Sequence, residues 1–564
     1  MKKRLALLLI FTMVVSMFLV GCTTKAPVAT PDPTEDVLAN NPAADKGNIL
    51  TIGGTNLNGV LNPINYTTVY DHWMIGAMFD PLLYTKTDGE LVTDGAVLEK
   101  YTVSPDGLVF NFTLRPGVKW HDGVEMTAED IAFTYDAIMR PDYKGRLFNL
   151  VRDIEGALDR KEGKADSVSG IKVISKYEVQ ITMTVAKATN LRNLTGDFYA
   201  IPKHYYDKPT VTEIEALDRQ PLGNGPFKLK NYVVEQFLEM EPFAEYWQGA
   251  PKLDGIIYKM VARPNELSEF EIGSIDAVNF ENSKENYEII EGFGHANLIN
   301  NWNNGYAYVG FNFNIPMFQD KLVRQALVYG LDRAGFVQSF FGDLGGKVAH
   351  TPISPVSWAY PEGGLNEYKY DPVKANQLLD QAGWKKEADG WRYKDGQKLA
   401  FTWKSYNEAE WSTKIVALAK ENWKELGVDL TIELMDFNSL STFIRKPENK
   451  DNFEMWNMAW GLTPDPNMQS VFGKDNFAPA NNMGWFYNEK IEELMEKGLL
   501  ELDQNKRKQI YLELAKEFNE EVPYIFVYVR MNPWLVNKRV KNFSPSEFQY
   551  WFHNAHLIEI VTKK

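Results

Sequence analysis

Strand-like and helix-like segments alternate along most of this 564-residue chain, and this alternation restricts its fold more than any other feature. Apolar and polar residues alternate over 110–114 and again over 179–185, the period-two pattern of half-buried strands. Between these segments Thr127 and Asp130 stand at the spacing of a capping box, and apolar residues follow at helical spacing over 131–138. This part of the chain therefore predicts mixed α and β structure.

The second half shows the same alternation with clearer ends. Asp371 and Pro372 provide a cap and a first-turn proline for a helix that we expect to stop at Gly383. A second helix is expected over 412–427, and apolar residues then alternate over 428–434 as in a strand. A helix that leads into a strand through so short a turn favours an α/β domain.

Length and composition indicate a folded protein with several domains. A chain of 564 residues is too long for one hydrophobic core, so two to four domains are expected. Hydrophobic residues make up 44% and charged residues 24%, an ordinary globular composition.

The first residues have the layout of an export signal. Basic residues at 2–4 precede an apolar run over 5–20, which is shorter than a membrane span requires. Gly21 then stands before Cys22, and Leu19-Val20-Gly21-Cys22 is similar to a bacterial lipobox. We therefore expect residues 1–21 to be a lipoprotein signal peptide, Cys22 to carry the lipid, and the mature protein to lie on the outer face of the cytoplasmic membrane.

Cys22 is the only cysteine, which excludes an internal disulfide and argues against cysteine-ligated zinc or iron-sulfur centres. Residues 22–47 are rich in Ala, Pro, Thr, Asp and Asn without apolar periodicity, as expected of a flexible tether. The folded body is expected to begin near Asn48.

Net charge excludes one large class of partner. The formal charge is −15, and loss of the three positive charges at residues 2–4 would make it −18. Nucleic-acid binding depends on neutralising phosphates, so such a chain is a poor nucleic-acid binder. An acidic surface instead suits solubility outside the cell.

Four motifs follow one another in an order that resembles the family 5 extracellular solute-binding proteins. They are LRPGVKWHDG at 114–123 running into TAEDI at 127–131, LGNGPF at 222–227, the segment 320–333 with VRQAL and DR, and 370–384 with YDP and AGW. That family includes dipeptide-, oligopeptide- and nickel-binding proteins of ABC importers. The chain is most similar to its Gram-positive oligopeptide-binding lipoproteins.

The resemblance implies an α/β, periplasmic-binding-protein-like fold with two lobes, an extra inserted domain and a ligand cleft between the lobes. Its first lobe would comprise residues 48–90, 222–310 and 535–564, the inserted domain 91–221, and the second lobe 311–534. It also implies a monomer that delivers its ligand to the transmembrane subunits of an ABC permease, with no cofactor and no enzymatic activity.

The resemblance places the ligand near the segment Trp460-Gly461-Leu462-Thr463-Pro464-Asp465. In peptide-binding relatives a similar tryptophan segment pairs with the peptide backbone, and a following aspartate binds the amine. In enteric relatives that aspartate stands at the position of Thr463 in this chain. The resemblance therefore assigns amine binding to the next aspartate, Asp465. Asp465 can also be explained as an ordinary turn residue before proline.

Further expected contacts come from other segments. Tyr66 and Thr67 stand where relatives supply a strand edge from the first lobe, and Trp485 stands in another cleft-facing segment of the family. The stretch 404–408 lacks the arginine with which dipeptide binders hold the peptide carboxylate, so longer peptides are favoured.

Three other ligand or reaction classes stay open. Tryptophans concentrated between 302 and 551 allow binding of cello- or xylo-oligosaccharides through aromatic faces. Nickel binding is less favoured, because only His553 and His556 are close together among seven histidines. A secreted hydrolase is the least favoured, since the chain has no Gly-x-Ser-x-Gly, His-Glu-x-x-His or phosphate-loop motif.

Overall fold

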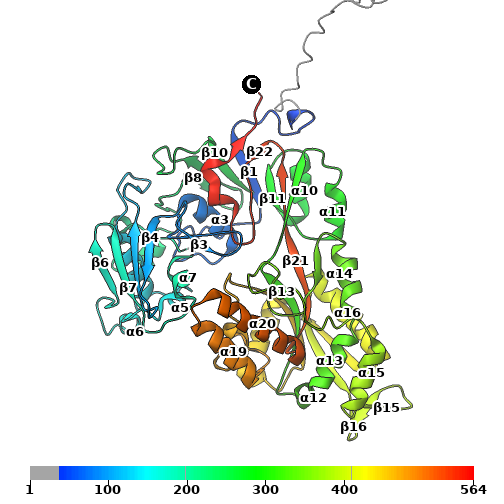
Figure 1. Cartoon of the computed structure of the whole chain (residues 1–564). Coiled ribbons are helices and arrows are strands. Elements are labelled where there is room, and N and C mark those ends of the chain that lie inside the picture. Colours follow the sequence, from blue (N-terminus) through cyan, green and yellow to red (C-terminus); the bar gives the residue numbers. More distant parts are fainter. Residues whose placement is uncertain (1–36, 197, 408, 564) are drawn as a thin grey trace, which may run out of the picture.

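The computed structural model describes residues 37–196, 198–407 and 409–563 (Figure 1). The expected signal peptide (1–21), the expected site of lipid attachment at Cys22 and the first part of the expected tether lie outside the described residues. Within the described part, twelve strands form one large sheet, ordered β19-β18-β20-β13-β21-β11-β1-β10-β9-β8, with β12 and β14 also paired to β21.

One end of the large sheet forms the first lobe. Its strands are β1 (Ile49–Gly54), β8 (Phe227–Val233), β9 (Phe237–Pro242), β10 (Gly255–Met260) and β11 (Ala277–Asn279). Strand β1 is parallel to both of its neighbours, β10 and β11. Helices α3 (Val69–Met78), α10 (Glu266–Glu271) and α11 (Lys284–Ile290) and the C-terminal pieces β22 (Val540–Lys541), η4 (Trp551–Leu557) and β23 (Glu559–Ile560) complete this lobe.

The other end forms the second lobe. Its strands are β13 (Gly305–Phe311), β18 (Ala400–Tyr406), β19 (Asp429–Met435) and β20 (Met455–Gly461). Its main helices are α13 (Lys321–Tyr329), α14 (Arg333–Phe341), α15 (Pro372–Gln381), α16 (Glu410–Glu425), α17 (Phe437–Arg445), α19 (Glu489–Leu500) and α20 (Gln504–Glu521). Shorter elements are α12 (Pro316–Gln319), α18 (Gln469–Phe472) and a small sheet of β15 (Lys385–Lys386), β16 (Arg392–Lys394) and β17 (Gln397–Lys398).

The lobes are joined by long paired strands that run through the middle of the molecule (Figure 1). Strand β21 (Tyr524–Asn537) pairs with β13 through its first half and with β11 and β12 (Ala296–Trp302) through its second. Strand β14 (Gly346–Val348) pairs with β21 opposite Arg530. Two chain crossings therefore lie side by side between the lobes, a geometry suited to hinge closure.

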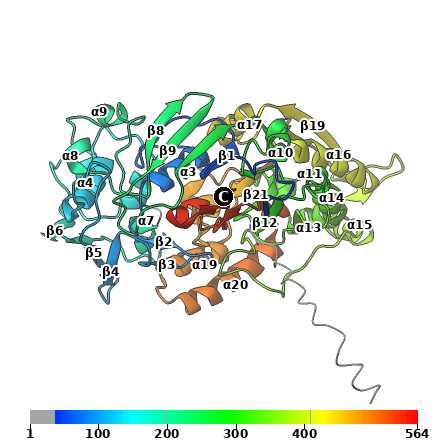
Figure 2. The same ribbon diagram turned by 90° about the horizontal axis from the view of Figure 1, so that it is seen from above.

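The expected inserted domain lies beside the first lobe and away from α15 in both views (Figures 1 and 2). Its sheet has the order β4 (Leu98–Val103), β5 (Val109–Leu114), β7 (Glu178–Thr182), β6 (Ile171–Ser175), covered by α4 (Ala128–Met139). Shorter elements are β2 (Tyr84–Thr85), β3 (Leu91–Val92), α5 (Phe148–Val151), α6 (Ala157–Lys161), α7 (Asn190–Thr195), α8 (Lys203–Tyr206) and α9 (Val211–Glu215). One continuous hydrophobic core contains Trp120 and Tyr135 of this region together with Leu50 and Ile52 of β1, so it shares its core with the first lobe.

Local sequence signals explain where several elements begin and end. Thr127 forms the predicted capping box with Asp130 at the start of α4, and the side chain of Asp371 caps α15. Helix α16 begins at Glu410, two residues before the predicted start, and Gly427 ends it in the left-handed conformation at φ +84°.

Residues 37–47, which the sequence analysis assigns to the tether, pack against the first lobe. Ala43 is fully buried, and the side chain of Asn41 donates to Oδ1 of Asn537 at 2.7 Å. The Lys46 ammonium donates to the carbonyl oxygen of Ser274 at 2.7 Å. The ordered body therefore begins before β1, because buried amide pairs compensate for the low apolar content of this segment.

The second lobe contacts the inserted domain as well as the crossing strands. The amide of Ala188 donates to the carbonyl of Leu499 at 3.0 Å. A Cβ placed on Gly107 would lie 3.0 Å from Leu502 Cδ1, so the β4–β5 turn touches the loop between α19 and α20. These contacts join the second lobe to the inserted domain, which shares its core with the first lobe.

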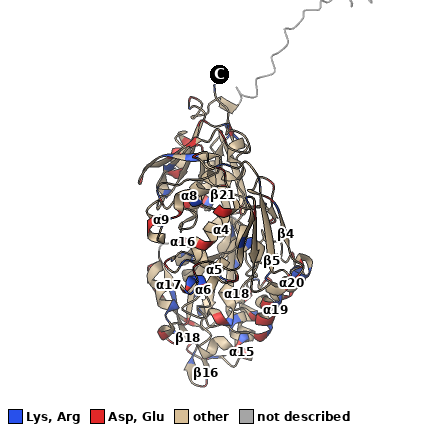
Figure 3. Ribbon diagram, turned by 90° about the vertical axis from the view of Figure 1, so that its left-hand side faces the viewer, with Lys and Arg blue, Asp and Glu red and all other residues tan. Residues whose placement is uncertain are grey.

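Acidic and basic residues are interspersed over the face shown in Figure 3. Among the described residues, no helix combines the length and the apolar character that crossing a membrane would require.

Candidate functional site

A cavity of about 460 Å³ lies where the two lobes meet, and we call it the interlobe cavity. It is lined by Glu281 and Asn282 of the first lobe, Asn303 of the β12–β13 turn, Tyr528 and Arg530 of β21, and from the second lobe Gly305, Tyr306, Ala307, Phe340, Phe341, Ala409, Glu410, Trp411, Ala459, Trp460 and Gly461. Its volume is within the range of small-molecule sites.

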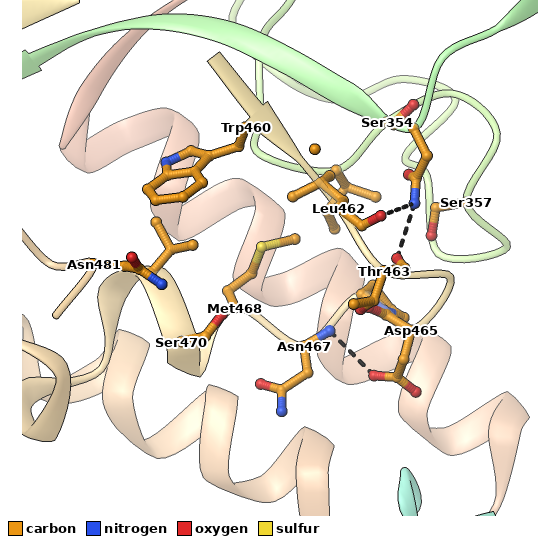
Figure 4. A pocket seen from close by; sticks show the side chains of 15 residues that line it. Ser354, Ser357, Trp460, Leu462, Thr463, Asp465, Asn467, Met468, Ser470 and Asn481 are labelled. Atoms are coloured by element: carbon orange, nitrogen blue, oxygen red, sulfur yellow. Dashed lines mark hydrogen bonds between the residues drawn. The ribbon is translucent and has the colours of Figure 1, made fainter. Parts of the chain in front are cut away.

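A smaller pocket of about 130 Å³ adjoins the interlobe cavity and shares Trp460 and Gly461 with it. Figure 4 shows this pocket with Trp460 and Asn481 on one side and Ser354 and Asp465 on the other. We call it the loop pocket, because the loop that follows β20 forms much of its wall.

Strand β20 presents an unpaired edge at both cavities. It pairs with β13 along its length, from Met455 to Gly461. On its other side β18 pairs only with Met455 and Trp456, so within the described residues no strand pairs with the remainder of that edge. A free strand edge in a ligand cavity offers backbone N–H and C=O groups to an extended ligand.

The loop after β20 is held in place by Asn304 from the β12–β13 turn. The side-chain amide of Asn304 donates to the carbonyls of Leu462 at 3.1 Å and Thr463 at 2.9 Å. The amide of Leu462 in turn donates to the carbonyl of Asn304 at 2.7 Å. The crossing strands therefore fix the conformation of the loop at the cavity.

Asp465 forms a bidentate ion pair inside the second lobe. Its Oδ2 accepts from Arg507 Nη1 at 2.9 Å and its Oδ1 from Arg507 Nη2 at 3.0 Å, with the two side chains only 11% and 6% exposed. Burial lowers the pKa of Arg507, but the Asp465 carboxylate outweighs this and raises it overall. The amide of Asn467 also donates to Asp465 Oδ1 at 3.1 Å, which closes the turn that the sequence suggested.

Aromatic rings pack against one another on and around β20 beside the interlobe cavity. Trp460 stacks on Tyr308 with ring centres 6.1 Å apart, and Tyr308 stacks on Tyr524 at 4.1 Å. Trp411 meets Tyr528 edge to face at 5.4 Å. These contacts keep the rings rigid, so the cavity needs little reorganisation to receive an apolar or planar group.

The structure brings some of the predicted site residues together and leaves others apart. Trp460 and Gly461 line both cavities and Asp465 lines the loop pocket, whereas Tyr66, Thr67 and Trp485 line neither.

The three distant residues have other neighbours. Tyr66 stacks on His72 at 5.0 Å and lies 4.4 Å from the Arg146 guanidinium carbon, and Thr67 is exposed just before the cap of α3. Trp485 adopts a left-handed φ of +54° and packs on Phe453 at 6.2 Å. Their roles in ligand binding stay predictions.

Arg530 is a cavity residue that was not predicted from the sequence. It follows the apolar run 524–529, all of which is buried, whereas Arg530 itself is exposed and lines the interlobe cavity. A charged residue that interrupts a long apolar strand is the signal that could have identified it.

Glu547 adds a partly buried carboxylate beside this region. Its Oε1 accepts from Asn303 Nδ2 at 3.1 Å. Burial raises the pKa of Glu547 to about 7, with hydrogen bonds from Asn304 and Asn303 and the positive charge of Arg530 opposing the rise.

The histidines of the C-terminal segment pack against aromatic rings. His553 meets Tyr84 at 4.4 Å and His556 meets Tyr246 at 5.3 Å, and burial lowers the pKa of His553 to about 4. Among the described residues, no group of three or more His, Cys, Asp or Glu side chains is placed to hold a metal ion.

Comparison with known proteins decides the family. Residues 93–479, more than half of the chain, match the family model described as bacterial extracellular solute-binding proteins, family 5 middle. The chain belongs to this family. The resemblance inferred from the sequence motifs is thereby confirmed.

Relatives cover nearly the whole chain. It is 27% identical over 546 residues to the oligopeptide-binding protein AppA of Bacillus subtilis, covering 94% of this chain and 95% of AppA. It is 27% identical over 493 residues to the oligopeptide-binding protein OppA of Lactococcus lactis, covering 82% and 80%. The solved structure of AppA with a nonapeptide superposes with a TM-score of 0.72 at 25% identity, covering 92% of this chain and 99% of that one. The predicted two-lobed α/β fold is confirmed.

Proposed function

We propose that this family 5 protein is the extracellular, lipid-anchored binding component of an ABC importer and that it captures oligopeptides in the interlobe cavity. Similarity to AppA and OppA over most of the chain supports the ligand class. The family consists of solute-binding proteins, which agrees with a role in capture rather than catalysis.

The free edge of β20 is the observation on which this proposal rests most. An extended peptide can add to that edge as a further strand, with the rings of Trp460 and Trp411 beside its side chains. Main-chain pairing of this kind does not depend on the side chains of the peptide, so it suits a protein that accepts varied peptide sequences.

Asp465 stays in the proposal as a partner for the peptide amine, on the condition that the amine shares the carboxylate with Arg507. Both of its carboxylate oxygens already accept from Arg507, so an ammonium group would have to share them. Trp460 and Gly461 supply the wall and the strand edge. The proposal does not require Tyr66, Thr67 or Trp485, because none of them lines either cavity.

The anchoring and delivery steps rest on the sequence. Cys22 at the end of a lipobox-like segment supports attachment to the outer face of the cytoplasmic membrane. The tether from Cys22 would then let a monomer close around its peptide and present it to the permease subunits.

One alternative ligand has a structural argument in its favour. The rings of Trp411, Trp460 and Tyr528 around the interlobe cavity could stack on the sugars of cello- or xylo-oligosaccharides. Nickel lacks comparable support, since no three His, Cys, Asp or Glu side chains of the described residues are grouped so that they could hold a metal ion.

A thermal-shift screen separates these ligands. A ligand that binds only the folded state raises the melting temperature, so the purified protein is tested with mixed peptides, cello- and xylo-oligosaccharides and nickel chloride. We expect a shift with peptides only. Shifts with oligosaccharides and none with peptides would refute the proposal.

A further inference from the structure

Arg530 occupies a distinctive position at the junction of the two lobes. It lies on β21, where the β12–β13 turn crosses the strand, and the amide of Asn303 donates to its carbonyl at 2.9 Å. Its side chain is exposed at the interlobe cavity. Both lobes reach this point, so a group bound to Arg530 is within range of each.

The charge of Arg530 is not neutralised by any contact within the described protein. Two buried arginines have carboxylate partners, Arg507 with Asp465 at 2.9 Å and Arg539 with Asp276 at 2.8 Å, whereas buried Arg333 donates to backbone carbonyls. For Arg530, no carboxylate oxygen of the described residues lies within 4.0 Å. Glu547 is close enough for the charge of Arg530 to lower its pKa.

Arg530 is also the only lysine or arginine among the described residues that line the interlobe cavity. The aromatic rings of Phe341, Trp411 and Tyr528 line the same cavity, together with the carboxylates of Glu281 and Glu410. The planar fork of a guanidinium matches both oxygens of a ligand carboxylate.

We propose that Arg530 binds a carboxylate of the ligand and thereby selects peptides that carry an anionic group near this crossing strand. The inference rests on the proposed function, because it takes the ligand to be a peptide. That carboxylate can be the peptide's C-terminus or an aspartate or glutamate side chain. The stretch 404–408 lacks the arginine with which dipeptide binders hold the peptide carboxylate, and Arg530 would supply a cation from strand β21 instead.

Calorimetric titration with matched peptides tests the assignment. A hexapeptide with a free C-terminus is compared with its C-terminal amide, and a peptide containing internal Glu with its Gln counterpart. We expect the protein to bind the anionic member of at least one pair roughly tenfold to hundredfold more tightly, the range of a charge-assisted hydrogen bond. The pair that shows the preference identifies the source of the carboxylate.

Substitutions of Arg530 then test whether this residue causes the preference for anionic peptides. In Arg530→Gln the preference is expected to disappear, and in Arg530→Lys part of it should remain. Arg152→Gln makes the same charge change at an exposed position of the inserted domain and should leave the preference intact.

The experiment distinguishes failure of the role of Arg530 from failure of the proposed peptide binding. If wild-type protein binds peptides but treats both pairs alike, or if Arg530→Gln keeps the preference, the role of Arg530 is refuted while peptide binding stands. If wild-type protein binds none of the peptides, the proposed function fails and this inference fails with it.

Discussion

Arg507 holds both carboxylate oxygens of Asp465, at 2.9 and 3.0 Å, in a site where neither side chain is more than 11% exposed. This pair joins the loop after β20 to helix α20. It gives Asp465 a structural role whether or not a ligand also reaches it, and it explains how the loop keeps its shape beside the cavity.

Replacing Asp465 with Asn should therefore destabilise the protein even without ligand. Removing one member of a buried ion pair leaves the other charge uncompensated and typically costs about 3 to 5 kcal/mol. The free energy of unfolding in urea measures this. Asp475→Asn, at an exposed position, serves as the control. Unchanged stability together with lost peptide binding would instead assign Asp465 to the ligand alone.

The raised pKa of the Asp80 carboxyl predicts how the stability of the protein depends on pH. It is 1% exposed and accepts hydrogen bonds from Trp247, Tyr246 and Tyr84, and burial raises its pKa to about 7. Between roughly pH 4 and 7 the folded state therefore keeps a proton that the unfolded state has lost, so stability falls as pH rises through this window and levels off above it.

Asp80→Asn removes that titration. We expect the decrease in unfolding free energy between pH 5 and 8, on the order of a few kcal/mol in the wild type, to become smaller in the variant. Glu266 and Glu547, whose pKa values are also raised to about 7 by burial, would maintain part of the slope. Parallel pH curves for variant and wild type would contradict this assignment.

The Gly-Asn-Gly turn tolerates no side chain at its first glycine. A Cβ on Gly223 would lie 2.0 Å from the carbonyl oxygen of Met78, while Asn224 accepts from the amide of Asp80 at 3.0 Å. Gly223→Ala should lower the unfolding free energy by about 1 to 3 kcal/mol through overpacking. Gly294→Ala, which meets no atom within 4 Å, should have little effect, and equal stability of the two variants would refute the argument.

Leu502 provides a test of lobe closure that leaves the ligand cavity unchanged. It touches the β4–β5 turn of the inserted domain at Gly107, yet its side chain stays 50% exposed. Leu502→Asp should weaken peptide binding a few-fold, about 1 kcal/mol, because it removes a contact between the second lobe and the inserted domain and so disfavours closure of the lobes. Leu158→Asp, equally exposed on α6, is the matched control, and equal affinities for both variants would exclude Leu502 from closure.

Local sequence patterns predicted much of the fold, because caps, turns and periodicity act over a few residues. Thr127, Asp371 and Gly427 mark helix ends that the structure confirms. The pairing of Asp465 with Arg507 joins residues 42 positions apart, and no local pattern reports such a contact.

The same limit applies to the boundaries of the body and of the site. Residues 37–47 read as a tether by composition, but Asn41 finds its partner in Asn537 at the other end of the chain. Arg530 can be recognised as a candidate site residue only from the structure, in which the crossing strands place it at the interlobe cavity.

Calorimetric titration of a peptide into the Gly461→Val variant tests the central claim most directly. Gly461 lines both cavities and no atom lies within 4 Å of the position of its Cβ, so the valine enters the cavity without disturbing the fold. Gly294→Val is the control at an equally open position outside the cavities. We predict 1:1 peptide binding by wild type and control, and loss of binding by Gly461→Val at an unchanged melting temperature. Full affinity in Gly461→Val would place the ligand elsewhere and contradict the account.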